Sequence, residues 1–222
     1  MRAKAPSRDA ERACWESGEH VVVGIDEVGR GAWAGPLTLG AVVLPREGRV
    51  NKIRDSKMLS QDQRELLFDR ITDWAVAWSV GHASQDECDK LGMSEAQRVA
   101  ATRAIEALDV EPDRVLVDGN WNFIRGYPTT TIIKGDRSCL AIAAASIIAK
   151  VTRDRLMAEA AVHHPEYGFE SNKGYPAPEH TAALAGYGPC RIHRHSWAFM
   201  DSLPWTAQKR YDREAELQPA LF

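Results

Sequence analysis

Three aspartates stand where predicted strands end, and this placement suggests metal chemistry. Asp26 closes one apolar run, Asp118 closes another, and Asp136 follows a third. If the first two strands are neighbours, their carboxylates meet at one edge of the sheet, where α/β folds place their sites. Clustered carboxylates repel one another unless a cation neutralises them, and all-oxygen ligands suit Mg²⁺ or Mn²⁺. The pattern therefore predicts a hard divalent metal.

Each of these aspartates also has a purely structural interpretation. Asp118 precedes a Gly-Asn pair and fits a plain turn, while Asp136 fits the N-cap of a helix. We interpret Asp154 as an exposed helix residue paired with Lys150, four positions earlier, and leave it out of the site. Position along the chain alone does not decide between the two interpretations.

Composition describes an ordinary globular protein and limits its function. The 222 residues are 44% hydrophobic and 27% charged, with a formal net charge of −3. That charge argues against a protein that coats nucleic acid through bulk positive potential, although a local basic groove is compatible with it. The charged start and the lack of a long apolar run predict a cytoplasmic protein without a membrane segment. Four widely spaced cysteines predict free thiols.

The elements that must position the aspartates follow from apolar runs and helix-start patterns. We expect five strands, at residues 21–26, 37–44, 75–80, 114–118 and 129–134. Capping-box pairs predict two helices, one starting at Ser60 with Gln63 and one at Ser94 with Gln97.

A long helix is predicted at residues 138–161, and its many small residues imply close packing on a sheet. A short helix is expected near residues 178–186. Strands first, then alternation of strand and helix, predict an α/β fold with a mixed sheet flanked by helices.

Several segments of the chain resemble the type 2 ribonucleases H, the bacterial ribonuclease HII family. The resemblance is carried, in family order, by GIDEVGRGAWAGP, DSKMLS, VLVDGN, KGD, AAASIIAKVTRDR, NKGYP followed by His180, and a late GP followed by HR. It covers most of residues 20–200 and is far more specific than a lone glycine motif. It implies an RNase H-like fold and a catalytic, metal-binding centre of four carboxylates, Asp26, Glu27, Asp118 and Asp136.

The order of elements and polar segments along the chain gives a domain plan, and the resemblance implies a catalytic domain and a reaction. We expect a flexible leader at 1–17, an RNase H-like catalytic domain at 18–162, a C-terminal helical lobe at 163–203 and a polar tail at 204–222. The family hydrolyses the RNA strand of RNA–DNA hybrids and incises DNA duplexes at embedded ribonucleotides, leaving 3′-hydroxyl and 5′-phosphate ends. Two Mg²⁺ or Mn²⁺ ions about 4 Å apart suit this reaction. Roles in DNA replication and ribonucleotide excision repair are implied.

Five further residues are candidates for substrate binding. Gly29, Arg30 and Gly31 match the family's GRG segment, which recognises the ribonucleotide 2′-hydroxyl, and Tyr175 matches a tyrosine that stacks on the adjacent sugar. Lys57 is a candidate phosphate contact. From the residues alone, the glycine segment could be only a hairpin turn, Tyr175 a plug of the lobe, and Lys57 a solvated lysine.

The adjacent acids Asp26 and Glu27 pose a geometric problem. Neighbouring side chains of a regular strand point to opposite faces, so both cannot reach one metal cluster directly. Either the strand ends or bulges at Glu27, or Glu27 contributes through its backbone carbonyl or a bound water. Near the C-terminus, we interpret His193 and His195 as structural or surface residues, and Trp197 as lobe packing where the family has phenylalanine.

The C-terminal tail suggests a protein partner, and two other functions compete with ribonuclease activity. Residues Gln218–Phe222 are similar to the Q-x-x-L-F peptides that dock on bacterial sliding clamps, although a frayed or core-docked tail is the alternative. We expect a monomer. Alternative functions are another RNase H-like metal-dependent nuclease, such as a junction nuclease or transposase, and a non-catalytic RNA-binding module, which would need no carboxylate cluster.

Overall fold

The computed structural model describes residues 5–48, 50–204 and 210–212, which fall into two compact units. The first, called the sheet unit, is formed by Met1–Val28, Thr38–His82 and Gln97–Arg153. The second, called the lobe unit, is formed by Gly29–Leu37, Ala83–Ala96 and Asp154–Phe222. Each unit is therefore assembled from three separated stretches of chain, and the first predicted strand leads from one unit into the other.

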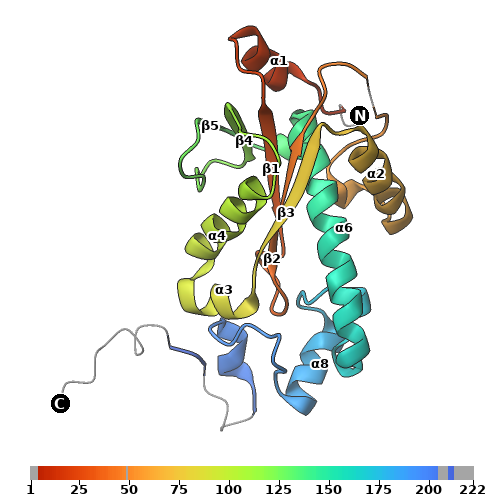
Figure 1. Cartoon of the computed structure of the whole chain (residues 1–222). Helices are drawn as coiled ribbons and strands as arrows, with labels where there is room; N and C mark the ends of the chain where they lie inside the picture. Colours follow the sequence, from red (N-terminus) through yellow and green to blue (C-terminus); the bar gives the residue numbers. More distant parts are fainter. Residues whose placement is uncertain (1–4, 49, 205–209, 213–222) are drawn as a thin grey trace, which may run out of the picture. The chain divides into compact units, whose positions relative to one another are not determined.

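A five-stranded mixed sheet is the centre of the sheet unit (Figure 1). Its order is β3-β2-β1-β4-β5, with β1 antiparallel to β2 and parallel to β4, and β4 parallel to β5. The strands are β1 (Val22–Val28), β2 (Leu37–Val43), β3 (Ala77–Ala83), β4 (Arg114–Asp118) and β5 (Thr129–Ile132). The mixed sheet and the adjacency of β1 and β4 are confirmed. β1 runs two residues beyond its predicted end, and β3 is shifted from 75–80.

Two strand glycines let the long helix α6 (Leu140–His163) contact the sheet directly. A Cβ added at Gly24 would lie 2.3 Å from the carbonyl carbon of Ala141, and one added at Gly40 would lie 2.5 Å from the carbonyl oxygen of Ala145. Both distances are shorter than any real contact, so only glycine permits this approach. The close packing expected from the small residues of this helix is confirmed.

The first predicted capping box is confirmed at the start of α2 (Gln61–Trp74). The Ser60 hydroxyl accepts the backbone N–H of Gln63, and the Gln63 side chain accepts the backbone N–H of Ser60. Two otherwise unpaired donors are satisfied reciprocally, which fixes the helix start.

The second predicted capping box, at Ser94, is wrong. Helix α4 (Met93–Glu106) already includes Ser94, and the box occurs earlier, at Ser84 and Glu87, where it starts a helix absent from the prediction, α3 (Gln85–Leu91). Gly92, with φ of +76°, separates the two helices. The similar Ser-x-x-Glu and Ser-x-x-Gln spacings ten residues apart explain the error, because either could begin a helix.

Part of the predicted leader is helical and bound to the start of α6. Helix α1 (Asp9–Glu16) carries Glu11, whose side chain is fully buried. One carboxylate oxygen of Glu11 accepts the backbone N–H of Ala141 at 2.7 Å, near the N-terminus of α6. A carboxylate is favourable there because it pairs with an unsatisfied donor and with the positive end of the helix dipole.

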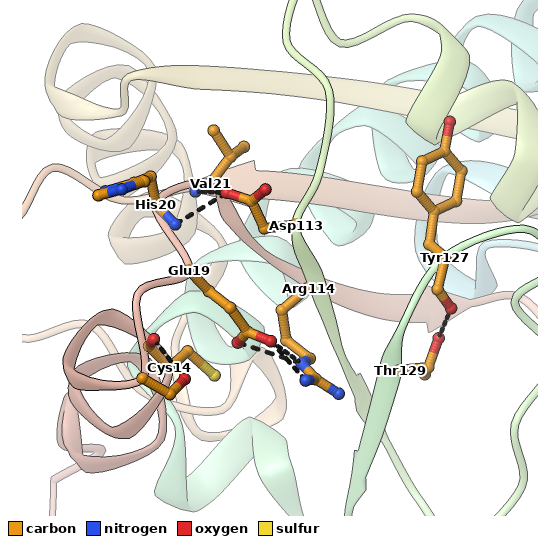
Figure 2. A network of polar contacts seen from close by, with 9 residues as sticks. Cys14, Glu19, His20, Val21, Asp113, Arg114, Tyr127 and Thr129 are labelled. Atoms are coloured by element: carbon orange, nitrogen blue, oxygen red, sulfur yellow. Dashed lines mark hydrogen bonds and ion pairs between the residues drawn. The ribbon is translucent and has the colours of Figure 1, made fainter.

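A polar network at the start of β1 and β4 holds these two strands side by side (Figure 2). The Asp113 carboxylate accepts the backbone N–H groups of His20 and Val21, both at 2.8 Å, and Arg114 pairs with Glu19. These bonds lower the pKa of Asp113 and, through the Arg114 guanidinium, the pKa of Glu19. The network anchors the register that carries on to the far ends of both strands.

The lobe unit is built around an aromatic cluster and contains most of the shorter helices. Its core includes Tyr167, Phe169, Leu184 and Phe199, with Trp197 packed against it as predicted. Helix α8 (Pro178–Tyr187) confirms the short helix expected near 178–186. The remaining helices of the two units are α5 (Gly135–Ser138), α7 (Phe169–Asn172) and the 3-10 turns η1 (Ser56–Met58), η2 (Pro165–Tyr167) and η3 (Ala198–Ser202).

Two further expectations concern membranes and thiols. Among the helices of the described residues, none is both long and apolar enough to cross a membrane. The four cysteines are free thiols, as the sequence predicted.

Candidate active site

Asp26 and Asp118 lie on the same face of the sheet at the ends of two parallel strands. The last paired residues of β1 and β4 are Ile25 and Val117, so the two aspartates come next on both strands. Gly24 packs on α6 and Leu116 belongs to the same core cluster as the α6 residues. Because strand side chains alternate, Asp26 and Asp118, two positions further on, face the α6 side as well.

Asp136 reaches this cluster on the short helix that precedes α6. The Asp118 carboxylate accepts the backbone N–H of Gly135 at 2.6 Å, so one site carboxylate anchors the segment that carries another. Lys134, in the left-handed conformation, sets the sharp entry into α5. Asp136 is buried, and burial followed by repulsion from Asp118 and Asp55 raises its pKa.

Asp26 is buried near three other carboxylates. Its pKa is raised well above the usual value, first by burial and then by Glu27, Asp118 and Asp136. Three carboxylates thus act on Asp26 near one edge of the sheet, and oxygen is the only donor type of this group. In charge and donor chemistry this set fits hard divalent cations such as Mg²⁺.

The side chains of the cluster are engaged with neighbouring groups of the chain. Within the described ranges, no three His, Cys, Asp or Glu side chains converge as a closed set of metal ligands. The Asp118 carboxylate is turned toward Gly135, and the Glu27 carboxylate accepts a hydrogen bond from the Gln97 side chain at 3.0 Å.

Glu27 lies on the opposite face of β1 from Asp26. Its ladder pairing is regular, with Asp26 opposite Gly40 and Glu27 opposite Leu39, so the strand end or bulge considered from the sequence is excluded. The side chain instead meets buried Gln97 of α4, the residue wrongly assigned to a capping box. A contribution through the Glu27 backbone carbonyl or a water stays a prediction.

Lys57 is exposed, and its positive charge partly offsets the burial and repulsion that raise the pKa of Asp136. Next to it, buried Asp55 accepts the backbone N–H of Lys57 at 2.9 Å and pairs with Arg137 at 3.3 Å. Asp55 is a fifth carboxylate beside the cluster that the sequence prediction missed, although it lies in the DSK segment. Because Asp55 bonds both Lys57 and Arg137, it orders the loop that carries Lys57.

In the lobe unit, the structure brings Tyr175 and the GRG segment together. The Tyr175 hydroxyl accepts the backbone N–H of Gly29 at 3.0 Å, across 146 positions of sequence. The backbone N–H groups of Trp33 and Ala34 both donate to the carbonyl of Gly174, at 2.8 and 3.2 Å. Tyr175 is half-buried, while Arg30 and Gly31 are exposed. Tyr175 is therefore bonded to the turn at Gly29, which the alternative of a simple core plug did not anticipate.

Arg194 holds the carbonyl side of the same turn and was not predicted as a site residue. Its fully buried guanidinium donates to the carbonyls of Gly29 (2.7 Å), Arg30 (3.0 Å) and Gly35 (3.0 and 3.2 Å). A trans peptide directs its N–H opposite to its carbonyl. The N–H groups of Arg30 and Gly31 therefore point away from Arg194. The only sequence signal was the late HR segment, which cannot reveal a buried cation.

Three other predictions concern the C-terminal half of the chain. Asp154 is buried, so its interpretation as an exposed residue is wrong. His193 is fully buried within the aromatic cluster, in line with a structural residue. The proposed clamp peptide, Gln218–Phe222, lies outside the described residues.

Comparisons with known proteins agree with the sequence motifs. A family model described as Ribonuclease HII matches residues 23–200. A ribonuclease HII of Streptomyces avermitilis is 46% identical over 213 residues, which is 95% of this chain and 91% of that protein.

Two solved structures share the fold. The ribonuclease H2 from Pyrococcus horikoshii OT3 superposes with a TM-score of 0.70 at 28% identity, over 82% of this chain and 96% of that one. The RNase HII of a PCNA:RNase HII complex from Archaeoglobus fulgidus gives 0.69 at 28% identity, over 80% and 95% of the two chains.

Proposed function

The chain belongs to the ribonuclease HII family and is a ribonuclease H, and on this premise we propose that it both hydrolyses the RNA strand of RNA–DNA hybrids and incises duplex DNA at embedded ribonucleotides. The observation that carries the proposal is the convergence of Asp26 and Asp118, at the ends of the paired strands β1 and β4, with Asp136 of α5, which Gly135 ties to Asp118; together with Glu27 these carboxylates raise the pKa of Asp26. Buried carboxylates that repel one another are stabilised when cations neutralise them, even where single oxygens accept hydrogen bonds, as Asp118 does from Gly135 and Glu27 from Gln97.

The site residues divide the work of phosphodiester hydrolysis. Asp26, Asp118 and Asp136 would hold Mg²⁺ or Mn²⁺, and Glu27 would complete the set indirectly, because Gln97 holds its carboxylate on the other face of β1. Two bound cations would supply Lewis acidity, lowering the pKa of water and neutralising charge on the phosphate. Asp118 also keeps α5 in place through Gly135, and Lys57 supplies a positive charge to the substrate side of Asp136.

Selectivity for ribonucleotides is assigned to the turn at residues 29–31 and to Tyr175. The 2′-hydroxyl distinguishes RNA from DNA, and backbone groups of a glycine turn can approach it closely. The Tyr175 hydroxyl accepts the N–H of Gly29 and Arg194 donates to its carbonyl, so the peptide groups before and after Gly29 are both fixed and the turn is held in one conformation before substrate binds. Such a preorganised turn would favour duplexes that carry a 2′-hydroxyl over all-DNA duplexes.

The test is cleavage of matched duplexes by the full chain with Mg²⁺ or Mn²⁺. One duplex carries a single ribonucleotide, one carries an RNA strand, and one is all DNA. We expect cutting of the first two, with 3′-hydroxyl and 5′-phosphate ends, and none of the third. Asp26→Asn serves as the matched inactive variant. Equal cutting of all-DNA duplex would refute the assignment of selectivity, and binding without metal-dependent cleavage would favour the RNA-binding alternative.

The C-terminal peptide is proposed to dock on a sliding clamp. The related RNase HII from Archaeoglobus fulgidus was solved in complex with PCNA, and Gln218–Phe222 has two apolar anchors after a polar segment. Deleting residues 218–222 should abolish binding to a bacterial clamp and leave cleavage of short duplexes unchanged. Unchanged clamp affinity of the truncated chain would dismiss the idea.

A further inference from the structure

A buried pair of histidines in the lobe unit connects the Cys190 turn to the backbone of Tyr175. His180 Nδ1 lies 2.9 Å from the carbonyl oxygen of Tyr175, and His180 Nε2 lies 2.9 Å from His193 Nε2. On the other side of the second ring, His193 Nδ1 lies 2.9 Å from the backbone nitrogen of Cys190. Both rings have no exposed surface. Four groups therefore form a continuous line of hydrogen bonds that ends on the substrate-facing loop.

The partners at the two ends determine which nitrogen of each ring carries a proton. A carbonyl oxygen only accepts, so His180 Nδ1 must be protonated and His180 Nε2 must accept. His193 Nε2 must then be protonated to donate to it, and His193 Nδ1 accepts the N–H of Cys190. Every nitrogen in the line is satisfied with both rings neutral, and every bond points toward Tyr175.

Charging either ring would break this line. A proton added at His180 Nε2 would face the His193 Nε2–H at 2.9 Å. A proton added at His193 Nδ1 would replace the bond from the Cys190 N–H with a longer one to the Cys190 carbonyl oxygen, 3.3 Å away, and the Cys190 thiol lies 3.2 Å from the same nitrogen. Burial agrees with this geometry, since it lowers the pKa of His180 and lowers the pKa of His193 to about 3. The other charged or titratable groups that act on the pair are Glu179, His195 and His164.

We propose that His180 and His193 are positioning residues for substrate recognition: their directed hydrogen-bond line fixes the Tyr175 carbonyl, and through it the ring that meets the ribonucleotide. The inference rests on the proposed function, because it takes Tyr175 to contact substrate. The hydroxyl of Tyr175 is held by Gly29 and its carbonyl by His180, so the side chain and the backbone of this residue have separate anchors. Adjacent residues His193 and Arg194 thus secure the Tyr175 loop and the Gly29 turn, respectively.

Two amide substitutions separate the two halves of the line. The His180→Gln amide extends to the Nε2 position, so it keeps a partner for His193 but loses the donor to Tyr175. The shorter His180→Asn amide lies near the Nδ1 position, so it keeps the donor to Tyr175 and loses the contact with His193. We expect kcat/KM on a duplex with one ribonucleotide to fall about tenfold in His180→Gln, the effect of one hydrogen bond, and distinctly less in His180→Asn. His163→Gln replaces an exposed histidine outside the line; it is the control and should match wild type.

A purely structural role makes the opposite prediction. Asparagine leaves the larger cavity in the aromatic cluster, so packing alone would make His180→Asn the more damaging change. The loss in His180→Gln should also disappear when it is combined with Tyr175→Ala, because no ring is left to position. His180→Asn as the weaker enzyme, or additive losses in the double variant, would overturn the inference.

A spectroscopic measurement covers the case in which a variant does not fold. Long-range ¹H–¹⁵N correlation spectra of the wild-type chain should show His180 protonated at Nδ1 and His193 at Nε2, whereas His180 protonated at Nε2 would overturn the proposed line. If the wild type does not cut the ribonucleotide duplex at all, the proposed function fails together with the inference. If it cuts and the losses are additive, only the inference fails.

Discussion

Replacing Arg194 by lysine tests whether the turn at residues 29–31, the proposed site of ribonucleotide recognition, depends on a buried guanidinium. The native side chain donates four hydrogen bonds to the carbonyls of Gly29, Arg30 and Gly35, with no solvent exposure. A lysine ammonium is a point charge that cannot span three carbonyls held in the planar geometry of the guanidinium. We expect Arg194→Lys to keep one of the three carbonyl partners and to lose the other two.

The magnitude follows from these two lost partners. A hydrogen bond to a charged group contributes about 1.5–3 kcal/mol, so the loss should lower the free energy of unfolding by about 3 kcal/mol or more. Domains are commonly stable by about 5–15 kcal/mol, so the variant is expected to fold. The freed turn should also lose its preorganisation, and a loss of about 1.4 kcal/mol there already lowers kcat/KM tenfold.

Urea unfolding and cleavage of a single-ribonucleotide duplex measure the two effects separately. Arg191→Lys is the matched control, because this arginine is exposed and should change stability by less than about 0.5 kcal/mol. A variant Arg194→Lys with wild-type unfolding and wild-type kcat/KM would refute the reasoning, since it would show that the carbonyl contacts do not hold the turn.

Three further predictions concern the carboxylate cluster and its support. Asp26→Asn should abolish metal-dependent cleavage yet raise the unfolding temperature of the metal-free protein at neutral pH, because it removes a repelling charge; a lower temperature in calorimetry would contradict the repulsion. The pKa values of Asp26 and Asp136 are raised, so the folded state binds protons more tightly than the unfolded chain does. The stability of the metal-free protein should therefore fall as the pH rises from about 4 through the raised pKa values. Thermal scans should show that Mg²⁺ reverses this trend. Gly40→Ala should destabilise the protein by about 1–3 kcal/mol through its clash with Ala145, whereas Gly186→Ala, with open space around it, should not; equal unfolding curves would show that α6 can shift without penalty.

The sequence alone was sufficient for the class of fold and for the main acidic residues. Apolar runs that end in Asp26 and Asp118 predicted adjacent strand ends, and the α6 segment predicted close packing, because both signals are local and repeat with the period of their element. The family resemblance named Glu27, the glycine turn and Tyr175 from short, ordered motifs. These predictions needed no knowledge of which distant residues meet.

Tertiary structure decided the partners of those residues. Gln97 looked like half of a capping box, but α4 begins at Met93, before Ser94, and the Gln97 side chain bonds Glu27. Arg194 looked like one more charged residue near the C-terminus, but it lies buried against carbonyls about 160 positions earlier. His180 and His193 gave no sign in the sequence that their rings would be hydrogen-bonded to each other. Hydrogen bonds between residues far apart in sequence leave no periodic signal, so their identity depends on which chain segments the fold brings together.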